Sequence, residues 1–355
     1  MSRARIVAAG HAVPKRREQA ELWEEYFAGY YANNRLARTV FRRSGVRYRH
    51  GVVDPLEEDI SELSTSNRMF RYAEHGPPLA AAAVEKSLAR AGRRPEEVSR
   101  LMLTTCTGYV APGADLLLAD KLGMPANLER LTLGHMGCYA ALPALATAAD
   151  SVAARGGVSV VVSLELTSLH VQPREEPMDR EQLVSHALFG DAAAAVVLIP
   201  EDAQGEDSGR GLEFVDSAVL TDTSGLGEMS WRVTDQGFRM GLSPKVPNFL
   251  GRHVAGLVTG LLGRNGLSPE EVAAWAIHPG GPEIIDVVAG RLELDEDTVA
   301  SSRRILAGYG NCSSATVLLI LEEIISDENV TSGGPVVALA FGPGLTLHAV
   351  LLKKA

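Results

Sequence analysis

Cys138 stands where the sequence predicts that a strand gives way to a helix. The apolar run from Leu131 leads into a turn with Gly134 and Gly137, and an alanine-rich stretch begins at Ala140. A thiol at a helix N-terminus meets unpaired backbone N–H groups and the positive end of the helix dipole. Both favour the thiolate, which is the nucleophilic form of cysteine. The competing interpretation is a buried cysteine that acts only as a small apolar side chain.

Two further residues have the chemistry to support a nucleophile. His278 follows the apolar segment 273–277 and precedes two glycines. It is therefore expected at the carboxyl end of a strand, where α/β sheets place their ligand crevices. Asn311 follows a glycine turn and opens a second apolar helix. An imidazole can share a proton with a thiol, and an amide N–H can donate to an oxyanion or enolate. Asn is also a favoured helix N-cap, and the two roles are compatible.

The elements that position these residues occur twice. Pro95-Glu-Glu-Val98 recurs as Pro269-Glu-Glu-Val272, roughly 175 residues later, each time between a helix that ends in glycine and an apolar strand. The glycine pair that opens the strand at 156 recurs at 333. Ordered landmarks at nearly constant spacing indicate a duplicated α/β chain. We expect halves at 1–205 and 206–355, with the seam near 201–210.

The duplication brings the chemistry together. Asn311 occupies the position in the second half that Cys138 occupies in the first. A pseudo-twofold axis would therefore set two helix N-termini on one crevice, with His278 at a strand end beside them. The first half also carries an insertion of about 25 residues around 172–185.

Composition excludes several classes of protein. The 355 residues are 46% apolar and 22% charged, enough to bury a large core. The net charge of −10 argues against a nucleic-acid partner. No apolar run reaches the length of a membrane span, and the N-terminal run is too short for a signal peptide.

The number and spacing of the cysteines indicate whether the chain holds a metal site and in which cellular compartment it works. Cys106, Cys138 and Cys312 are scattered, without the spacing of a disulfide framework or a zinc site. We therefore expect no metal, no membrane association and a reducing, cytoplasmic location.

One local stretch departs from the acidic balance. Six arginines lie between Arg35 and Arg49. The run can be a solvated face or a docking patch for an anionic ligand, and the sequence leaves both open.

The motifs together resemble one family over essentially the whole chain. These are Gly137-Cys138-Tyr-Ala, Ile277-His-Pro-Gly-Gly281, Gly310-Asn-Cys-Ser-Ser-Ala315, Gly342-Pro-Gly-Leu-Thr346, Pro112-Gly-Ala-Asp115 and Ala187-Leu-Phe-Gly-Asp191. They are similar to the type III polyketide synthases, the chalcone and stilbene synthase-like enzymes. The resemblance implies a thiolase-like fold, two duplicated halves in a five-layered α/β/α/β/α arrangement, working as a homodimer.

The resemblance also implies an activity. Cys138 would accept a starter acyl group from acyl-CoA, and His278 and Asn311 would stabilise the enolate formed as malonyl-CoA loses carbon dioxide. Repeated condensation and then cyclisation or release would give a pyrone, resorcinol or phenolic polyketide. CoA thioesters are the substrates, and no further cofactor is implied.

Other residues match family positions around the substrate. Phe189 matches a gatekeeper, and Met240 falls where the second gatekeeper is usually aromatic. Positions that line the family's cavity are matched by Cys106, Thr107, Thr167, His170, Ser313 and, with an ambiguous alignment, Trp231. Arg43 matches a CoA-binding residue, and Arg38, Arg42 and Arg47 are candidates to assist it. Ala111 stands where plant members carry a methionine that reaches the partner's active site, so that cross-subunit wall is in doubt.

Two other hypotheses compete. A ketoacyl synthase III-like enzyme would perform one condensation with malonyl-acyl carrier protein, but Pro-Gly-Gly after His278 departs from the Gln-Ala-Asn of that group. A non-catalytic scaffold of the same fold would not need Cys138, His278 and Asn311 together. A papain-type protease shares the Cys, His and Asn types, but not the duplication.

Overall fold

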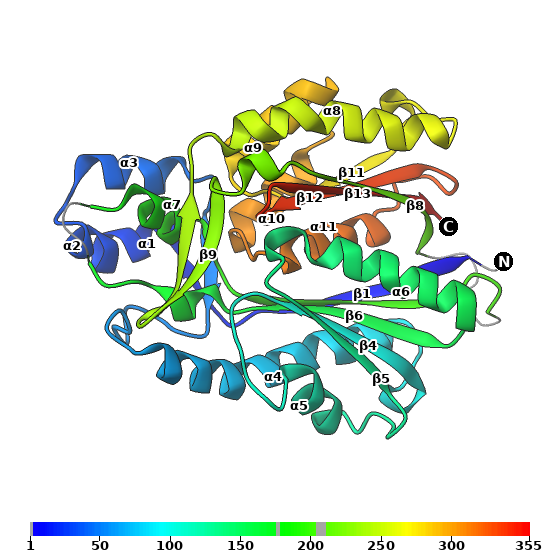
Figure 1. The fold of residues 1–355 in the computed structure, drawn as a ribbon, viewed down its shortest axis with the longest axis horizontal. Helices are drawn as coiled ribbons and strands as arrows, with labels where there is room; N and C mark the ends of the chain where they lie inside the picture. Colours follow the sequence, from blue (N-terminus) through cyan, green and yellow to red (C-terminus); the bar gives the residue numbers. More distant parts are fainter. Residues whose placement is uncertain (1–2, 175–177, 204–210) are drawn as a thin grey trace.

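Two sheets and three helical layers make up the fold. The computed structural model describes residues 3–174, 178–203 and 211–355. Its layers run helix, sheet, helix, sheet, helix (Figure 1), which confirms the predicted five-layered α/β arrangement. The strands of the sheets are β1 (Ala4–Ala12), β4 (Val98–Thr105), β5 (Glu129–Gly134), β6 (Val158–Glu165), β7 (Ala192–Pro200), β8 (Leu212–Thr221), β11 (Ala274–Ile277), β12 (Pro335–Gly342) and β13 (Thr346–Lys354).

The strand order shows the duplication directly. The order β1-β7-β6-β4 in the first half is repeated as β8-β13-β12-β11 in the second. β1 and β8 pair through Arg5 with Glu213 and Ile6 with Leu212, which joins the two sheet layers into one nine-stranded sheet. β5 extends the first half beyond β4, whereas β11 ends the described sheet on the other side.

The turns repeat as well. In the 3₁₀ turns η2 (Pro95–Glu97) and η6 (Pro269–Glu271), the last glutamate accepts a hydrogen bond from the backbone N–H of the residue before the turn, and the two turns lead into β4 and β11. The predicted repeat is therefore confirmed. The seam at 201–210 lies largely outside the described residues, and the boundary between 205 and 206 lies wholly outside them, so that boundary stays a prediction.

The middle layer consists of α6 (Ala141–Arg155) and α11 (Ala315–Ser326). Nearly every residue of the first two turns of α11 is buried, because a helix that is apolar all round must be covered on all sides. These helices and the inner faces of both sheets form the central core. The outer faces are covered by α4 (Thr65–Arg90) and α5 (Ala114–Lys121) on one side, and by α8 (Val246–Arg264) and α9 (Pro282–Leu292) on the other. α10 (Ala300–Tyr309) leads into the Asn311 turn.

Segments outside the repeat gather at one end of the layers (Figure 1). They are β2 (Lys15–Glu18), α1 (Gln19–Leu22), η1 (Trp23–Phe27), α2 (Ala28–Tyr30), α3 (Arg35–Arg43), β3 (Tyr48–Gly51), η4 (Thr167–His170), α7 (Arg180–Leu188), η5 (Thr223–Gly225), β9 (Met229–Thr234) and β10 (Gly237–Leu242).

The predicted insertion is among these segments. α7 lies in the long connection from β6 to β7, whereas β12 and β13 are joined by a short turn at 343–345. The insertion is confirmed, although its residues 175–177 lie outside the described part of the chain.

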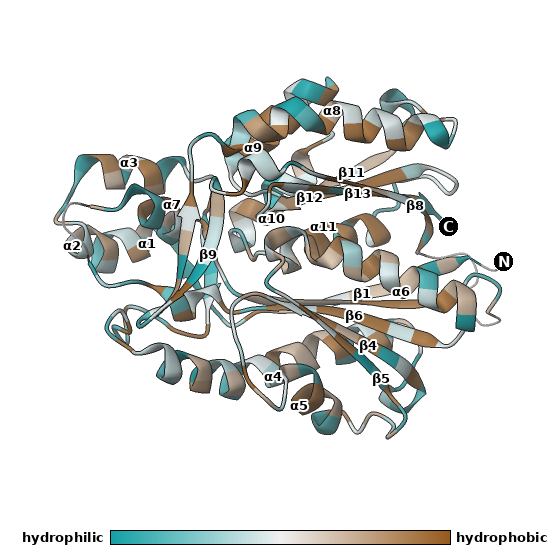
Figure 2. Ribbon diagram, in the orientation of Figure 1, coloured by the Kyte–Doolittle hydropathy of each residue, from teal (hydrophilic) through white to brown (hydrophobic). Residues whose placement is uncertain are grey.

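Apolar residues follow the layers. Figure 2 shows the strands and α11 largely apolar, while α8 alternates between apolar and polar residues. Within the described residues, no helix combines the length and apolar character needed to cross a membrane.

Candidate active site

Cys138 lies in the 3₁₀ turn η3 (Gly137–Tyr139), between β5 and α6. Gly137 has a φ of +76°, and a Cβ there would lie 2.5 Å from Cδ of Pro343. Only glycine fits both constraints, so Gly137 allows the turn that carries Cys138 to pack closely against the loop between β12 and β13.

Burial dominates the electrostatics of Cys138. The residue is 8% exposed and makes no disulfide. Burial raises the pKa of Cys138 to about 12, while hydrogen bonds with the side chains of Ser313 and Asn311 act in the opposite direction. Burial therefore favours the neutral thiol, whereas the helix terminus was expected to favour the thiolate.

His278 follows β11 directly, as predicted, with its backbone N–H donating to Leu339 O at 2.8 Å. Its ring is fully buried beside Phe341, with 5.5 Å between ring centroids. Burial lowers the pKa of His278 to about 3, so the imidazole is neutral. Neither ring nitrogen has a hydrogen-bond partner among the described residues. A buried imidazole with both nitrogens unpaired is suited to a substrate.

The structure contradicts one of the two roles expected for Asn311, because α11 begins at Ala315 and its N-cap is Ser314. Asn311 Oδ1 instead accepts from the backbone N–H of Ser313 at 2.9 Å, within the turn that precedes the helix. Its Nδ2 makes a long contact of 3.4 Å with Gly280 O, which leaves a second N–H available. Its backbone pairs with the strand-like turn after α7: the N–H donates to Leu188 O at 2.8 Å, and the carbonyl accepts from Gly190 N at 3.1 Å. This pairing holds Asn311 beside Phe189.

All three residues line one cavity. The outer cavity, of about 600 Å³, lies between α3, α7, β10 and the start of α9, and Cys138, His278 and Asn311 all line it. Its walls include Phe189 and Met240 and are mostly apolar. Residues from both halves of the duplication therefore meet on one surface, as the repeat predicted.

A smaller space lies beyond Cys138. This inner chamber, of about 20 Å³, is lined by Cys106, Thr107, Gly137, Cys138, Thr167, Phe189, Met229, Trp231, Met240, Ser313 and Pro343. Phe189 and Met240, the two predicted gatekeepers, line both the outer cavity and the inner chamber, as do Cys138 and Met229. Trp231, whose alignment was ambiguous, is placed by its Nε1, which donates to Cys106 O at 2.6 Å.

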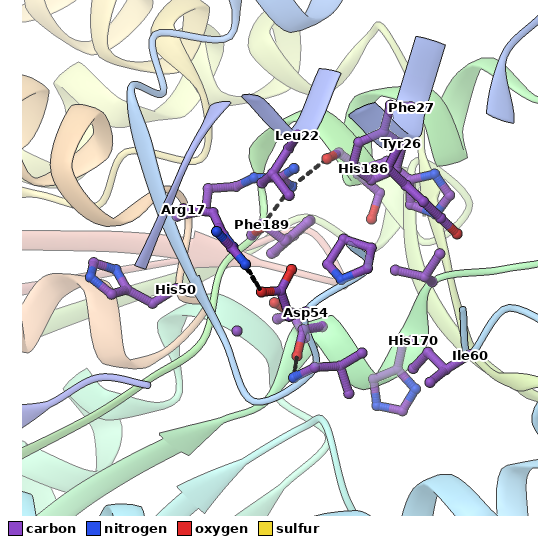
Figure 3. Close-up of a pocket in the computed structure, with 18 of the residues that line it drawn as sticks. Arg17, Leu22, Tyr26, Phe27, His50, Asp54, Ile60, His170, His186 and Phe189 are labelled. Atoms are coloured by element: carbon purple, nitrogen blue, oxygen red, sulfur yellow. Dashed lines mark hydrogen bonds and ion pairs between the residues drawn. The ribbon is translucent and has the colours of Figure 1, made fainter. Parts of the chain in front are cut away.

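A third space lies on the far side of Phe189. This rear chamber, of about 70 Å³, is drawn in Figure 3, with Phe189 near its centre and the Arg17–Asp54 ion pair across it. His170 lines this chamber and not the other two. Its ring nitrogens bond to Thr107 O at 2.7 Å and Phe238 N at 3.0 Å. His170 is thus a neutral wall residue, and burial lowers its pKa to about 3.

Sequence reasoning did not identify Glu165, the buried carboxyl beneath the inner chamber. Its oxygens accept from Cys106 N at 3.1 Å, Thr107 Oγ1 at 2.9 Å and Ser314 Oγ at 2.5 Å. Burial raises the pKa of Glu165, and these hydrogen bonds oppose the shift. A charged residue at the end of the apolar strand β6 was the signal that could have revealed it.

The basic residues divide into two groups. Arg43, the predicted CoA-binding residue, lines the outer cavity, and so does Arg180, which carried no sequence signal. Arg38, Arg42 and Arg47 do not line it. Ala111 is exposed and lines none of the three spaces. Within the described residues, no group of three or more His, Cys, Asp or Glu side chains is placed to hold a metal ion.

Comparisons with known proteins agree with this geometry. The family model for the N-terminal domain of chalcone and stilbene synthases matches residues 1–202, and the C-terminal domain model matches 213–355. The chain is 32% identical to "Alpha-pyrone synthesis polyketide synthase-like Pks18" of Mycobacterium tuberculosis, covering 94% of this chain and 86% of the relative. It is 33% identical to the 1,3,6,8-tetrahydroxynaphthalene synthase of Streptomyces peucetius subsp. caesius, covering 99% and 94% respectively.

Solved structures show the same fold. A polyketide synthase of the brown alga Ectocarpus siliculosus superposes with a TM-score of 0.91 at 23% identity, over 100% of this chain and 99% of that one. The type III domain of Steely1 from Dictyostelium gives 0.92 at 24% identity, over 99% of each chain. The chain therefore belongs to the chalcone and stilbene synthase family. It is a type III polyketide synthase, an acyltransferase that forms carbon–carbon bonds.

Proposed function

We propose that Cys138 carries the acyl chain and that His278 and Asn311 serve the decarboxylation and transfer steps. The observation that supports this assignment is their convergence, from two halves, on one outer cavity of about 600 Å³. Cys312, although adjacent to Asn311 in sequence, is fully buried and lines none of the three spaces.

The loading step uses the neutral forms of the site. Cys138 Sγ attacks the thioester carbonyl of acyl-CoA, and its proton passes to His278, whose ring has an unpaired acceptor nitrogen. The new C–S bond forms as the bond to CoA breaks, and CoA leaves as the thiol after receiving that proton. The N–H of Asn311 stabilises the oxyanion between the two states.

The extension step needs no strong base. Malonyl-CoA loses carbon dioxide, and the electron pair of the broken C–C bond becomes an enolate beside the N–H donors of His278 and Asn311. The enolate carbon attacks the thioester on Cys138, the new C–C bond forms, and the Cys138 thiolate is released. The apolar walls of the outer cavity limit protonation of the enolate by water.

Residues between the two spaces and residues of the outer cavity have further roles in this proposal. Phe189 and Met240 separate the outer cavity, where CoA arrives, from the inner chamber. Arg43 and Arg180 place positive charge on the outer cavity for CoA phosphate groups. No cofactor besides the CoA thioesters is proposed.

The names of two relatives support a proposal for the class of product. One relative is named for α-pyrone synthesis and another for a tetrahydroxynaphthalene. We place this enzyme among producers of pyrone, resorcinol or phenolic polyketides. We further propose a cytoplasmic location, which suits three unpaired cysteines.

The assembly proposed is a homodimer joined at β5. This strand pairs with β4 on one side, ends the sheet on the other, and exposes Leu131 at 44%. Antiparallel pairing with the same strand of a second copy would satisfy the unpaired edge.

Two cysteine variants test the catalytic assignment. Cys138→Ala should lose the acyl adduct seen by intact-protein mass spectrometry and all polyketide product from acyl-CoA and malonyl-CoA. Cys312→Ala is the matched control and should keep both. His278→Ala and Asn311→Ala should reduce the release of carbon dioxide from malonyl-CoA. Product formation by Cys138→Ala would overturn the proposal.

A further inference from the structure

The C-cap of α7 is the gate residue Phe189, which pairs with the backbone of Asn311. The last four carbonyls of a helix have no partner inside it, so other groups must satisfy them. In α7, the carbonyl of Ala187 accepts from Gln19 Nε2 at 2.8 Å, and the carbonyl of Leu188 accepts from Asn311 N at 2.8 Å. The other two carbonyls at this helix end depend on a further donor.

Arg49 is the donor to both of these carbonyls. Its Nη1 donates to His186 O and, at 3.2 Å, to Phe189 O. The guanidinium lies over the rings of Phe27 and Phe41, at 5.5 and 5.9 Å from their centroids. Burial lowers the pKa of Arg49 to about 10, so the group remains charged at neutral pH. Because a cation at a helix C-terminus also interacts favourably with the helix dipole, Arg49 acts as the cap of α7.

The capped segment carries the gate and holds one of the three proposed catalytic residues. Asn311 binds this segment on both sides of Phe189, because its N–H donates to Leu188 O and its carbonyl accepts from Gly190 N. The two backbones approach closely, since a Cβ at Gly310 would lie 2.6 Å from Leu188 O. Close-packed segments transmit displacements to one another. A shift of the α7 terminus should therefore also shift Asn311.

We propose that Arg49 is a positioning residue, which sets the places of Phe189 and Asn311 by capping the C-terminus of α7. The inference rests on the proposed roles of those two residues. Arg49 lines the rear chamber and neither the outer cavity nor the inner chamber, so it acts without touching the reacting atoms. Its loss should lower the rate of decarboxylation, which uses Asn311, more than the affinity for malonyl-CoA, whose phosphate groups are assigned to Arg43 and Arg180.

The kinetics of malonyl-CoA decarboxylation test the proposal, with release of carbon dioxide as the readout. Arg49→Met removes the charge and the donors and keeps an unbranched side chain. It should lower kcat by about tenfold to hundredfold, because small misplacements of a catalytic group are costly, and leave KM within about threefold. Arg49→Lys keeps the charge but not the planar fork, and should lower kcat by about threefold to tenfold. Both variants should also change the ratio of shorter to longer polyketides, since Phe189 is displaced.

Arg49→Ala allows a rescue experiment. The space left by the side chain joins the rear chamber, which the exposed Lys15 and Glu58 also line. Guanidinium chloride, far below the concentrations that unfold proteins, should therefore restore kcat severalfold, whereas KCl at the same concentration should not.

The matched control is Arg100→Met. Arg100 is also buried, and its Nη1 donates at 2.8 Å to the carbonyl of Gly156, the C-cap of α6, at the end of that helix away from Cys138. This variant should be less stable to urea than the wild-type protein and should keep the wild-type kcat.

The proposal is overturned if Arg49→Met keeps the wild-type kcat or, should that variant not fold, if Arg49→Lys keeps it. It is also overturned if Arg100→Met lowers kcat equally, or if guanidinium chloride restores nothing in folded Arg49→Ala. Decarboxylation at the wild-type rate by Asn311→Ala would instead show that the proposed role of Asn311 is wrong.

Discussion

At the scale of single residues, one buried arginine holds the segment that carries two of the residues around the site. Arg68 is fully buried, and its guanidinium donates to five backbone carbonyls, with no carboxylate as partner. Two of the carbonyls belong to Leu169 and Val171, around the η4 segment that carries Thr167 and His170. Burial lowers the pKa of Arg68 to about 10, so it remains charged at neutral pH. Only the planar guanidinium of arginine has five N–H donors, so no other side chain can satisfy all five carbonyls.

Replacement of Arg68 by lysine should therefore destabilise the protein. An ammonium has three donors, so at least two buried carbonyls lose their partner. We expect a loss of about 2–5 kcal/mol in the free energy of unfolding, measured by urea denaturation. Arg71→Lys is the control, because its pair with Glu58 is at the surface and should contribute less than about 1 kcal/mol. Equal losses in the two variants would contradict this role for Arg68.

At the scale of elements, two segments outside the repeat carry the residues of the proposed gate. Phe189 follows the C-terminus of α7, and Met240 lies on β10. The buried Gln182 of α7 donates to Met240 O at 2.6 Å. Asp179, the N-cap of α7, forms an ion pair with Arg239 of β10. The two gate side chains are therefore positioned by one helix–strand contact.

Gln182→Met should loosen this contact while filling a similar volume. The Met240 carbonyl loses its donor, so the β10 backbone gains freedom at the gate. We expect the ratio of shorter to longer polyketides to shift severalfold, measured by mass spectrometry, with the rate of Cys138 loading unchanged. Gln236→Met at the tip of the same hairpin should leave the ratio as it was, since its side chain has no hydrogen bond among the described residues. An unchanged ratio in Gln182→Met would show that β10 is held by other contacts.

At the scale of the whole molecule, burial of histidine links stability to pH. His170, His186 and His278 have pKa values lowered by burial to about 3, and His50 and His348 to about 4. An unfolded histidine binds its proton near pH 6.5, whereas these remain neutral in the folded protein. As pH falls below about 6.5 the unfolded state therefore gains protons that the folded state does not, and stability decreases.

Between pH 7 and 5 the free energy of unfolding should thus fall, by at most about 1.4 kcal/mol per pH unit for each of these histidines. The urea midpoint measured across this range tests the slope. His186→Gln, which removes one such group, should give a shallower slope even if it lowers stability at pH 7. A flat dependence in the wild-type protein would mean that these histidines titrate alike in both states.

Assembly is the other property of the whole molecule. Leu131→Glu places a charge on the exposed edge strand β5, where a second copy would bury it uncompensated. We expect the dimer to give way to monomer in light-scattering measurements. Val233→Glu, on a more exposed apolar residue of β9, is the control and should not change the mass. A monomeric wild-type protein would contradict the proposed interface.

The sequence by itself determined the α/β class, the duplication and the places of Cys138, His278 and Asn311. Each of these depends on local order along the chain: a glycine turn before a helix, or an apolar strand before a loop. The repeated sequence landmarks then showed which positions of the two halves correspond, and this step needs no knowledge of side-chain packing. Local patterns also marked Gly137, whose positive φ and close approach to Pro343 are both present.

The tertiary structure alone decided which side chains share a space. It turned His170 to the rear chamber, set Glu165 beneath the inner chamber, and brought Arg180 to the outer cavity beside Arg43. It also changed the expectation for the Cys138 thiol, because burial raises the pKa of this group above its ordinary value. These outcomes depend on contacts between segments far apart in the chain, and such contacts and the desolvation they cause leave no periodic pattern in the sequence.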